Sequence, residues 1–361
     1  MKKFKALLFL TTSILAMGAT SELKSEEVKG MTPEVKAIIE KYKKENEDLK
    51  KLVETRVKVV GESEASDAAI VEGVKKDQWA FSSRTYIERE DYSLSGNDFG
   101  NSEDIFMFGV GVSAVKGKIG LHLNTEQRMT GTLNSDGADN QNTRNDYKIR
   151  YQLTDEVGVH FKYRNERGNK KRDAWAAEQN RNRDRFELGT DFNLYDGMWS
   201  GWLVGGHDID SQNGAKNKGN YYEGDMGPTF PITEKLALRP TVYSTGEFYD
   251  NNNETMLDHQ LRLMAIYKYT DELTLMPRVR YSLSRTLEED SYTYRYDSDY
   301  RVRAELLFNY VLTESASIDG GVAYDWQDRN YKYKTKGTGE RYDKTRGIDM
   351  LWYTLGFTYL F

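Results

Sequence analysis

Apolar and polar residues alternate with a period of two along most of the chain. In DYKIRYQL (146–153) the apolar residues Tyr147, Ile149 and Tyr151 are separated by charged ones, and VGVHFKYRNE (157–166) repeats the pattern. Successive side chains of a strand point to opposite faces of the sheet. Each such run therefore predicts a β-strand with one apolar face and one charged face.

Fourteen runs of this kind predict fourteen strands. They lie near residues 79–90, 104–114, 118–128, 144–153, 157–167, 184–194, 198–208, 220–232, 236–248, 256–269, 273–285, 299–312, 316–328 and 348–361. The connections between them alternate without exception between six short turns and seven long loops. Four of the short turns begin with Thr followed by an acidic residue, at Thr154, Thr233, Thr270 and Thr313.

The strand number, the strand length and the alternating connections are typical of an outer-membrane barrel. Only a closed barrel lets a sheet cross lipid, because an open edge would leave backbone groups unpaired in hydrocarbon. We therefore expect an all-β fold, a 14-stranded antiparallel transmembrane β-barrel over residues 78–361, with the short turns at the periplasmic end. Their Thr, Asp and Glu side chains would satisfy local amides. The alternative is a soluble β-sandwich, which does not require the regular difference between turns and loops.

The residues before the barrel predict three further segments. Residues 1–19 combine early lysines, a short apolar stretch and small residues, which is typical of a secretory signal peptide rather than a membrane anchor. Residues 20–60 predict a periplasmic helix, a possible coiled coil that would support a homotrimer, and residues 61–77 a linker. The alternative is one amphipathic helix lying on its own domain. The coiled-coil positions include Val35, Ile39, Tyr42, Asn46, Leu49 and Val53.

The chain ends in GFTYLF, which places Phe357, Tyr359 and Phe361 on one face of the last strand. With Gly356, these residues resemble the C-terminal signal by which the barrel-assembly machinery recognises its clients. Residues 79–361 as a whole resemble a bacterial porin, similar to the FomA-type porins of fusobacteria and more distantly to the oligogalacturonate-specific porins. The resemblance implies an outer-membrane location and passive diffusion of small hydrophilic solutes.

The charged face of each strand supplies the candidate functional residues, because it would face the lumen. These pore-lining candidates are Arg128, Lys148, Arg150, Lys162, Arg164, Arg185, Arg262, Arg278, Arg280, Arg301, Arg303 and Glu305. The basic residues gather in two groups, on 144–167 and on 256–312, which would face each other across a 14-stranded ring. Either they solvate a wet wall beside neighbouring acids, or they form a cationic constriction that prefers anions or acidic sugars.

Composition excludes several other classes of protein. The chain has no Cys and a net charge of −6, so thiol chemistry is absent and no nucleic-acid partner is indicated. The four scattered His suggest wall residues rather than metal ligands, and no Ser, His and Asp grouping suggests a nucleophile. We expect no catalytic residue, metal or cofactor. Two function classes stay open, a diffusion channel and a structural or adhesive barrel acting through its loops, of which loop 168–182 would narrow the pore or stay exposed.

Overall fold

The computed structural model describes residues 78–94, 104–130, 140–170, 179–212, 215–250, 254–288, 295–334 and 341–361. The predicted signal peptide, periplasmic helix, coiled coil and linker all lie outside these residues. In the described part of the chain, no helix is long and apolar enough to cross a membrane.

The described chain consists of fifteen antiparallel β-strands. The first seven are β1 (Ala80–Leu94), β2 (Ile105–Lys116), β3 (Ile119–Thr130), β4 (Asn140–Gln152), β5 (Val157–Lys170), β6 (Gln179–Leu194) and β7 (Trp199–Gln212). The others are β8 (Ala215–Pro228), β9 (Phe230–Thr233), β10 (Leu236–Tyr249), β11 (Glu254–Lys268), β12 (Leu273–Glu288), β13 (Arg295–Thr313), β14 (Ala316–Lys334) and β15 (Arg341–Leu360). Because only Thr229 separates β8 from β9, these two form one crossing, and the strands make the fourteen crossings that the sequence predicted.

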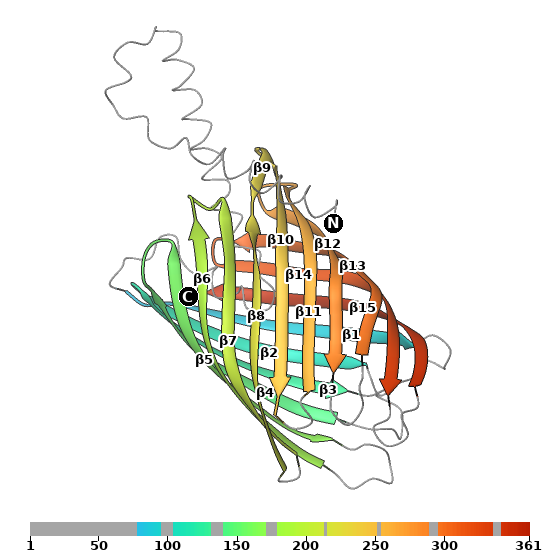
Figure 1. Ribbon diagram of the computed structural model, residues 1–361. Helices are drawn as coiled ribbons and strands as arrows, with labels where there is room; N and C mark the ends of the chain where they lie inside the picture. The colour runs from blue at the N-terminus through green and yellow to red at the C-terminus, as the bar shows by residue number, and fades with distance from the viewer. Residues whose placement is uncertain are drawn as a thin grey trace, which may run out of the picture. The chain divides into compact units, whose positions relative to one another are not determined.

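Hydrogen bonding closes the sheet into a ring. Each strand pairs with its neighbours along the chain, and β15 returns to pair with β1 from Ser82 opposite Leu360 to Leu94 opposite Ile348 (Figure 1). The amide of Phe361 also donates to the carbonyl of Phe81 at 2.9 Å. The predicted closed 14-stranded barrel is therefore confirmed.

The two faces of the barrel differ as the period of two predicted. Ile149 is 57% exposed on the outer face, between the exposed rings of Tyr147 and Tyr151. The alternate residues, Lys148 and Arg150, lie on the inner face with partial burial. Large apolar side chains are exposed in the same way on strands around the ring, which is the surface that a lipid bilayer requires. The predicted register is confirmed, and a slip of one residue would turn Arg150 into the lipid.

The short turns use their threonines as the sequence predicted. The hydroxyl oxygen of Thr154 accepts from the amides of Glu156 and Val157 at 3.2 and 3.1 Å. That of Thr270 accepts from two amides in the same way, at 3.2 and 3.0 Å. Thr233 and Thr313 each accept from one turn amide at 3.2 Å. The acidic residues that follow these threonines do not share one role. Asp271, for example, has its pKa lowered by its hydrogen bond to Lys268 at 2.7 Å.

The strands extend further toward the long loops than the sequence predicted. Within the predicted loop 329–347, β14 continues to Lys334 and β15 already begins at Arg341. The predicted loop 168–182 is also strand at both ends, because β5 reaches Lys170 and β6 starts at Gln179; residues 171–178 lie outside the described part. The Asn, Asp and Lys residues at the ends of these predicted loops suggested irregular structure, but they continue the hydrogen-bonded ladder of the strands.

Glycines on the inner face let aromatic side chains cross a strand. Tyr86 on β1, Gly109 on β2 and Glu126 on β3 are consecutive cross-strand partners, and Tyr86 lies over the glycine to donate to Glu126 at 2.7 Å. Tyr221 crosses Gly206 in the same way and donates to Glu187 at 2.7 Å. A Cβ atom on Gly109 would lie 2.1 Å from the Tyr86 ring. Gly109 therefore leaves the space that the Tyr86 ring occupies, and the ring in turn positions the Glu126 carboxylate.

One interruption of the ladder lies beside β10. Strand β10 pairs with β9 over Leu236–Leu238 and with β8 over Val242–Tyr249, so the residues from Arg239 to Thr241 have no cross-strand partner on that side. Pro228 and Pro240 lie here, and a proline has no amide to donate. A Cβ atom on Gly227 would lie 2.1 Å from the carbonyl of Pro240, so the strands still touch.

Two neighbouring glycines provide a test of the inner-face packing. Alanine at Gly206 would place Cβ 2.3 Å from the Phe186 carbonyl and 2.5 Å from the Tyr221 ring. We expect Gly206→Ala to lower the free energy of unfolding by about 1–3 kcal/mol, measured by urea unfolding in detergent micelles. The control is Gly205→Ala on the exposed outer face, where the nearest atom is 3.8 Å from the new Cβ, and stability should not fall. Equal stability of the two variants would contradict the packing described.

Candidate functional site

Charged side chains occupy the inner face of the barrel and are largely buried there. Lys162, Glu187, Arg185 and Asp208 are each less than 9% exposed, although they face the interior of the ring rather than a packed apolar core. Burying an ion costs several kcal/mol unless it is paired and hydrogen-bonded. The partners of these groups therefore define what the inner face can do.

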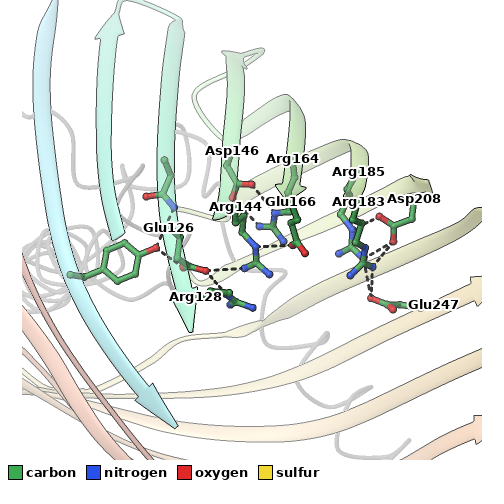
Figure 2. Close-up of polar contacts among 12 residues, drawn as sticks. Glu126, Arg128, Arg144, Asp146, Arg164, Glu166, Arg183, Arg185, Asp208 and Glu247 are labelled. Atoms are coloured by element: carbon green, nitrogen blue, oxygen red, sulfur yellow. Dashed lines mark hydrogen bonds and ion pairs between the residues drawn. The ribbon is translucent and has the colours of Figure 1, made fainter. Parts of the chain in front are cut away.

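On β3 to β6 the charges alternate across the strands. Glu126, Arg144, Glu166 and Arg183 are consecutive cross-strand partners. The guanidinium of Arg144 lies between the two glutamates, 2.8 Å from Glu166 and 3.5 Å from Glu126 (Figure 2). Opposite charges directly across a strand pair stabilise a sheet, and here each one serves two neighbours.

Further pairs complete this balanced network. Arg164 makes a two-point contact with Asp146 at 2.7 and 2.9 Å, and Arg128 contacts Glu126. Arg185 binds Asp208 through two hydrogen bonds of 2.7 Å, and its Nη2 lies 3.0 Å from Glu247 of β10. The charged residues labelled in Figure 2 are five arginines and five carboxylates, so the network has no net charge. They are Glu126, Arg128, Arg144, Asp146, Arg164, Glu166, Arg183, Arg185, Asp208 and Glu247.

Glu187 is a second meeting point beside that network. Its carboxylate is 3.2 Å from His160 Nε2 and 2.9 Å from Lys162 Nζ, and it accepts from Tyr221. The guanidinium of Arg185 stacks on the Tyr221 ring, 3.8 Å from its centroid. Lys162 thus lies next to an acid from the neighbouring strand, whereas Arg150 on β4 reaches Asp191 on β6, two strands away, through contacts of 2.9 and 2.5 Å.

The inner face of β10 to β13 is different, because arginines outnumber acids. We call Arg239, Arg262, Arg278, Arg280, Arg301 and Arg303 the arginine wall. Glu305, whose side chain is fully buried, contacts three of its members: Arg278 at close range, Arg280 at 2.8 Å and Arg303 at 2.6 Å. Arg262 is 2.7 Å from Asp225. Arg301 contacts Asp325 at 2.7 Å and Asp258 at 3.2 Å.

The charge of the wall follows from these contacts. The ion pairs of the wall involve the four carboxylates Asp225, Asp258, Glu305 and Asp325. Glu223 of β8, which accepts from Tyr243 at 2.8 Å, is a fifth acid on this part of the inner face. The six arginines still outnumber these acids. The basic group predicted on 256–312 is thus only partly neutralised. The group predicted on 144–167 differs, since Arg150, Lys162 and Arg164 each meet an acid. Lys148 lies opposite His122 on β3 and opposite Lys162 on β5.

Several residues of the site were missed at the level of sequence. Arg144, Arg183, Asp208, Asp225 and Asp258 were not among the candidates; Arg183 lies one residue before the predicted strand 184–194, whereas the other four lie within predicted strands. A signal was present, since QNRNRDR (179–185) places Arg at every second position. The contact of Tyr86 with Glu126 had no linear signal, because it joins residues two strands apart.

The residues of the C-terminal motif lie on β15 and at its end. Phe357, Tyr359 and Phe361 are exposed on the outer face, and the last two rings meet edge to face at 5.0 Å. Gly356 is on the inner face, where a Cβ atom would lie 2.9 Å from both Arg84 and Asp319. Recognition of this motif by the assembly machinery stays a prediction.

Two Ser and His pairs occur on the barrel. Ser113 and His122 are 2.8 Å apart on the inner face, and Ser244 and His259 are 2.8 Å apart on the outer face. Each is a direct cross-strand pair. Among the described residues, no group of three or more His, Asp or Glu could hold a metal ion.

Comparison with known proteins supports the architecture. No protein-family model matches the sequence, and no curated protein matches it. Among solved structures, CymD, a monoaromatic hydrocarbon channel, matches with a TM-score of 0.51 and 9% identity over 79% of this chain and 89% of CymD. The chain has the fold of an outer-membrane channel. A Pseudomonas aeruginosa FadL homologue matches with a TM-score of 0.50 and 10% identity, over 78% of this chain and 90% of that one. The predicted FomA-type family is not confirmed.

The crowded carboxylate of the arginine wall gives a testable prediction. Glu305→Gln removes the negative charge that three buried guanidinium groups share. We expect the free energy of unfolding to fall by about 3–5 kcal/mol, measured by urea unfolding in detergent micelles. Glu314→Gln, in the exposed turn between β13 and β14, is the control and should leave it within about 0.5 kcal/mol. A loss no larger than that of the control would show that Glu305 does not stabilise the wall.

Proposed function

We propose that the protein is an outer-membrane channel through which small hydrophilic solutes diffuse. The observation that carries this proposal is the polarity of the inner face, where arginines, lysines and carboxylates occupy alternate positions on most of the strands. Fourteen strands enclose more space than the eight or so that side chains alone can fill. A wide ring with an ionic interior suits water and polar solutes.

The same lining argues against an apolar cargo. CymD is described as a monoaromatic hydrocarbon channel, and similarity of fold does not transfer its cargo to this chain. A hydrocarbon passing the partly exposed side chains of Arg150 and Asp191 would displace water from these ions without offering them a new partner. Hydrated solutes replace those contacts, so the inner face favours them.

Among hydrophilic solutes we propose a preference for anions and acidic sugars. The balanced network of Figure 2 contributes no net charge, while the arginine wall on β10 to β13 has more arginines than acids. Low-dielectric walls focus such a field into the lumen, which raises the local anion concentration. The proposed preference therefore rests on one side of the ring rather than on two opposed basic walls.

The surroundings of the barrel complete the proposal. The exposed apolar belt would contact outer-membrane lipid, and the C-terminal motif would be read by the barrel-assembly machinery. A homotrimer held by the residues 20–60, with Asn46 in its seam, remains part of the proposal. Those residues lie outside the described part of the chain.

Planar-bilayer recording tests the channel directly. The purified barrel, checked as folded by its heat-dependent gel mobility, should give discrete open steps in potassium chloride. The alternative, a structural or adhesive barrel that works through its loops, predicts a silent membrane from the same folded protein. Silence over the full range of protein concentration and voltage would overturn the proposal.

The ion preference has its own test, in a pair of variants. Arg280→Gln with Arg303→Gln removes two positive charges from the wall and leaves Arg278 to pair with Glu305. The reversal potential across a potassium chloride gradient should move toward cation preference, more at 0.1 M than at 1 M salt, because the Debye length falls from about 10 Å to about 3 Å.

The matched control is Arg144→Gln with Glu166→Gln, which removes a neighbouring pair without changing net charge. Its reversal potential should equal that of the wild type. A wild-type channel that already prefers cations, or equal potentials for both double variants, would rule out selection by the arginine wall.

A further inference from the structure

The register of the arginine wall brings like charges together. Arg262, Arg280 and Arg303 are direct cross-strand partners on β11, β12 and β13. Arg239 and Arg278 both lie opposite Met264 in the adjacent row. Neighbouring strands are about 4.8 Å apart, so five arginines from four strands are held within two rows. Like charges placed directly across a strand pair destabilise a sheet, so this arrangement needs negative charge.

The carboxylates on the arginine wall do not supply enough negative charge to balance the arginines. Glu305 must serve three guanidinium groups, and its contacts are imperfect. Arg303 Nε lies 2.6 Å from Glu305 Oε1, but neither atom makes a hydrogen bond, because their alignment does not allow one. The oxygen therefore provides charge without satisfying the donor.

Arg239 is the least compensated member of the wall. Among the described residues, none of the ion pairs given above involves Arg239, and its Nε is buried without a hydrogen-bond partner. Asp225 attracts Arg239 electrostatically, but its Oδ2 already binds Arg262. The Oδ1 atom of Asp225 has no hydrogen-bond partner. Arg239 also lies where the ladder between β10 and β8–β9 is interrupted, so its neighbours leave backbone groups unpaired as well.

Aromatic rings hold part of the wall in position before any ligand arrives. The guanidinium of Arg262 stacks 3.6 Å from the centroid of Tyr243, and that of Arg303 lies 4.9 Å from Trp352. A planar guanidinium fixed by stacking loses little freedom when it binds an oxyanion. The wall is thus a rigid array of donors in which arginines outnumber acids.

We propose that the arginine wall is a binding site for the phosphate group of a small solute, inorganic phosphate or a phosphate monoester. This inference rests on the proposed channel function and names its solute class. A phosphate carries about −1.5 to −2 charges near neutral pH, so it can offset an excess of arginines over acids. Its oxygens accept from several guanidinium groups at once, whereas a carboxylate offers only two oxygens and one charge. Flux of such solutes is then saturable rather than proportional to concentration.

Block of chloride current by phosphate tests the site. At constant ionic strength, inorganic phosphate should reduce the single-channel chloride current of the wild type with a saturating dependence. Arg239→Gln should raise the phosphate concentration that halves the current about tenfold, the loss expected for one charge-assisted contact. Lys235→Gln removes the same charge from the exposed turn of the same hairpin and should leave that concentration within about twofold.

A second measurement does not depend on conduction. Phosphate that binds the folded barrel should raise the midpoint of urea unfolding in detergent relative to chloride at equal ionic strength, in the wild type and in Lys235→Gln. The rise should be smaller in Arg239→Gln, as a site about tenfold weaker requires, which separates binding from the general stabilising effect of phosphate salts.

The outcomes distinguish the two proposals. A conducting channel with no phosphate effect specific to Arg239 overturns the site and leaves the channel standing. A silent barrel that phosphate stabilises through Arg239 supports the site and overturns the channel. Succinate acting as strongly as phosphate in both assays would overturn the assignment to phosphate in favour of dicarboxylates.

Discussion

Closure of the backbone hydrogen-bond ladder is the constraint on which the rest of this structure depends. In a bilayer each unpaired amide or carbonyl costs several kcal/mol, so the sheet must return to its own first strand. The pairing of β15 with β1 meets that requirement. Once the ring is closed, every residue must face either lipid or the interior, and the period of two decides which. All charges within the membrane are then confined to the inner face.

That confinement explains why the interior is a set of ion pairs. Arginines and carboxylates that cannot reach the outer surface must neutralise one another, and neighbouring strands offer the shortest route. The alternation Glu126, Arg144, Glu166, Arg183 follows the strand order and gives Arg144 and Glu166 an oppositely charged neighbour on each side. The departure on β11 to β13, where Arg262, Arg280 and Arg303 face one another, is therefore the more informative feature. These three arginines keep positive charge on the inner face, whereas the alternation on the other strands neutralises it.

The sequence was sufficient for the fold and for much of the inner face, for a physical reason. Alternation is local, so Lys148 and Arg150 could be assigned to the interior from their neighbours alone. Partner choice is not local. The stagger of the strands brings Asp191 to Arg150 and Asp146 to Arg164, and only the register between strands reveals it. The same holds for Tyr86, which reaches Glu126 because Gly109 leaves a gap on the strand between them.

The pairing of β1 with β15 also governs how the barrel can form. Arg84 and Asp319 are joined at 2.5 Å although 235 positions separate them along the chain. Contacts of such separation carry a large loop-closure entropy and form slowly. Until β15 arrives, the curved sheet has two open edges, and each edge is a template for pairing with another chain. A chain that lost only its last strand would thus be a sheet prone to aggregation, and not a barrel of thirteen strands.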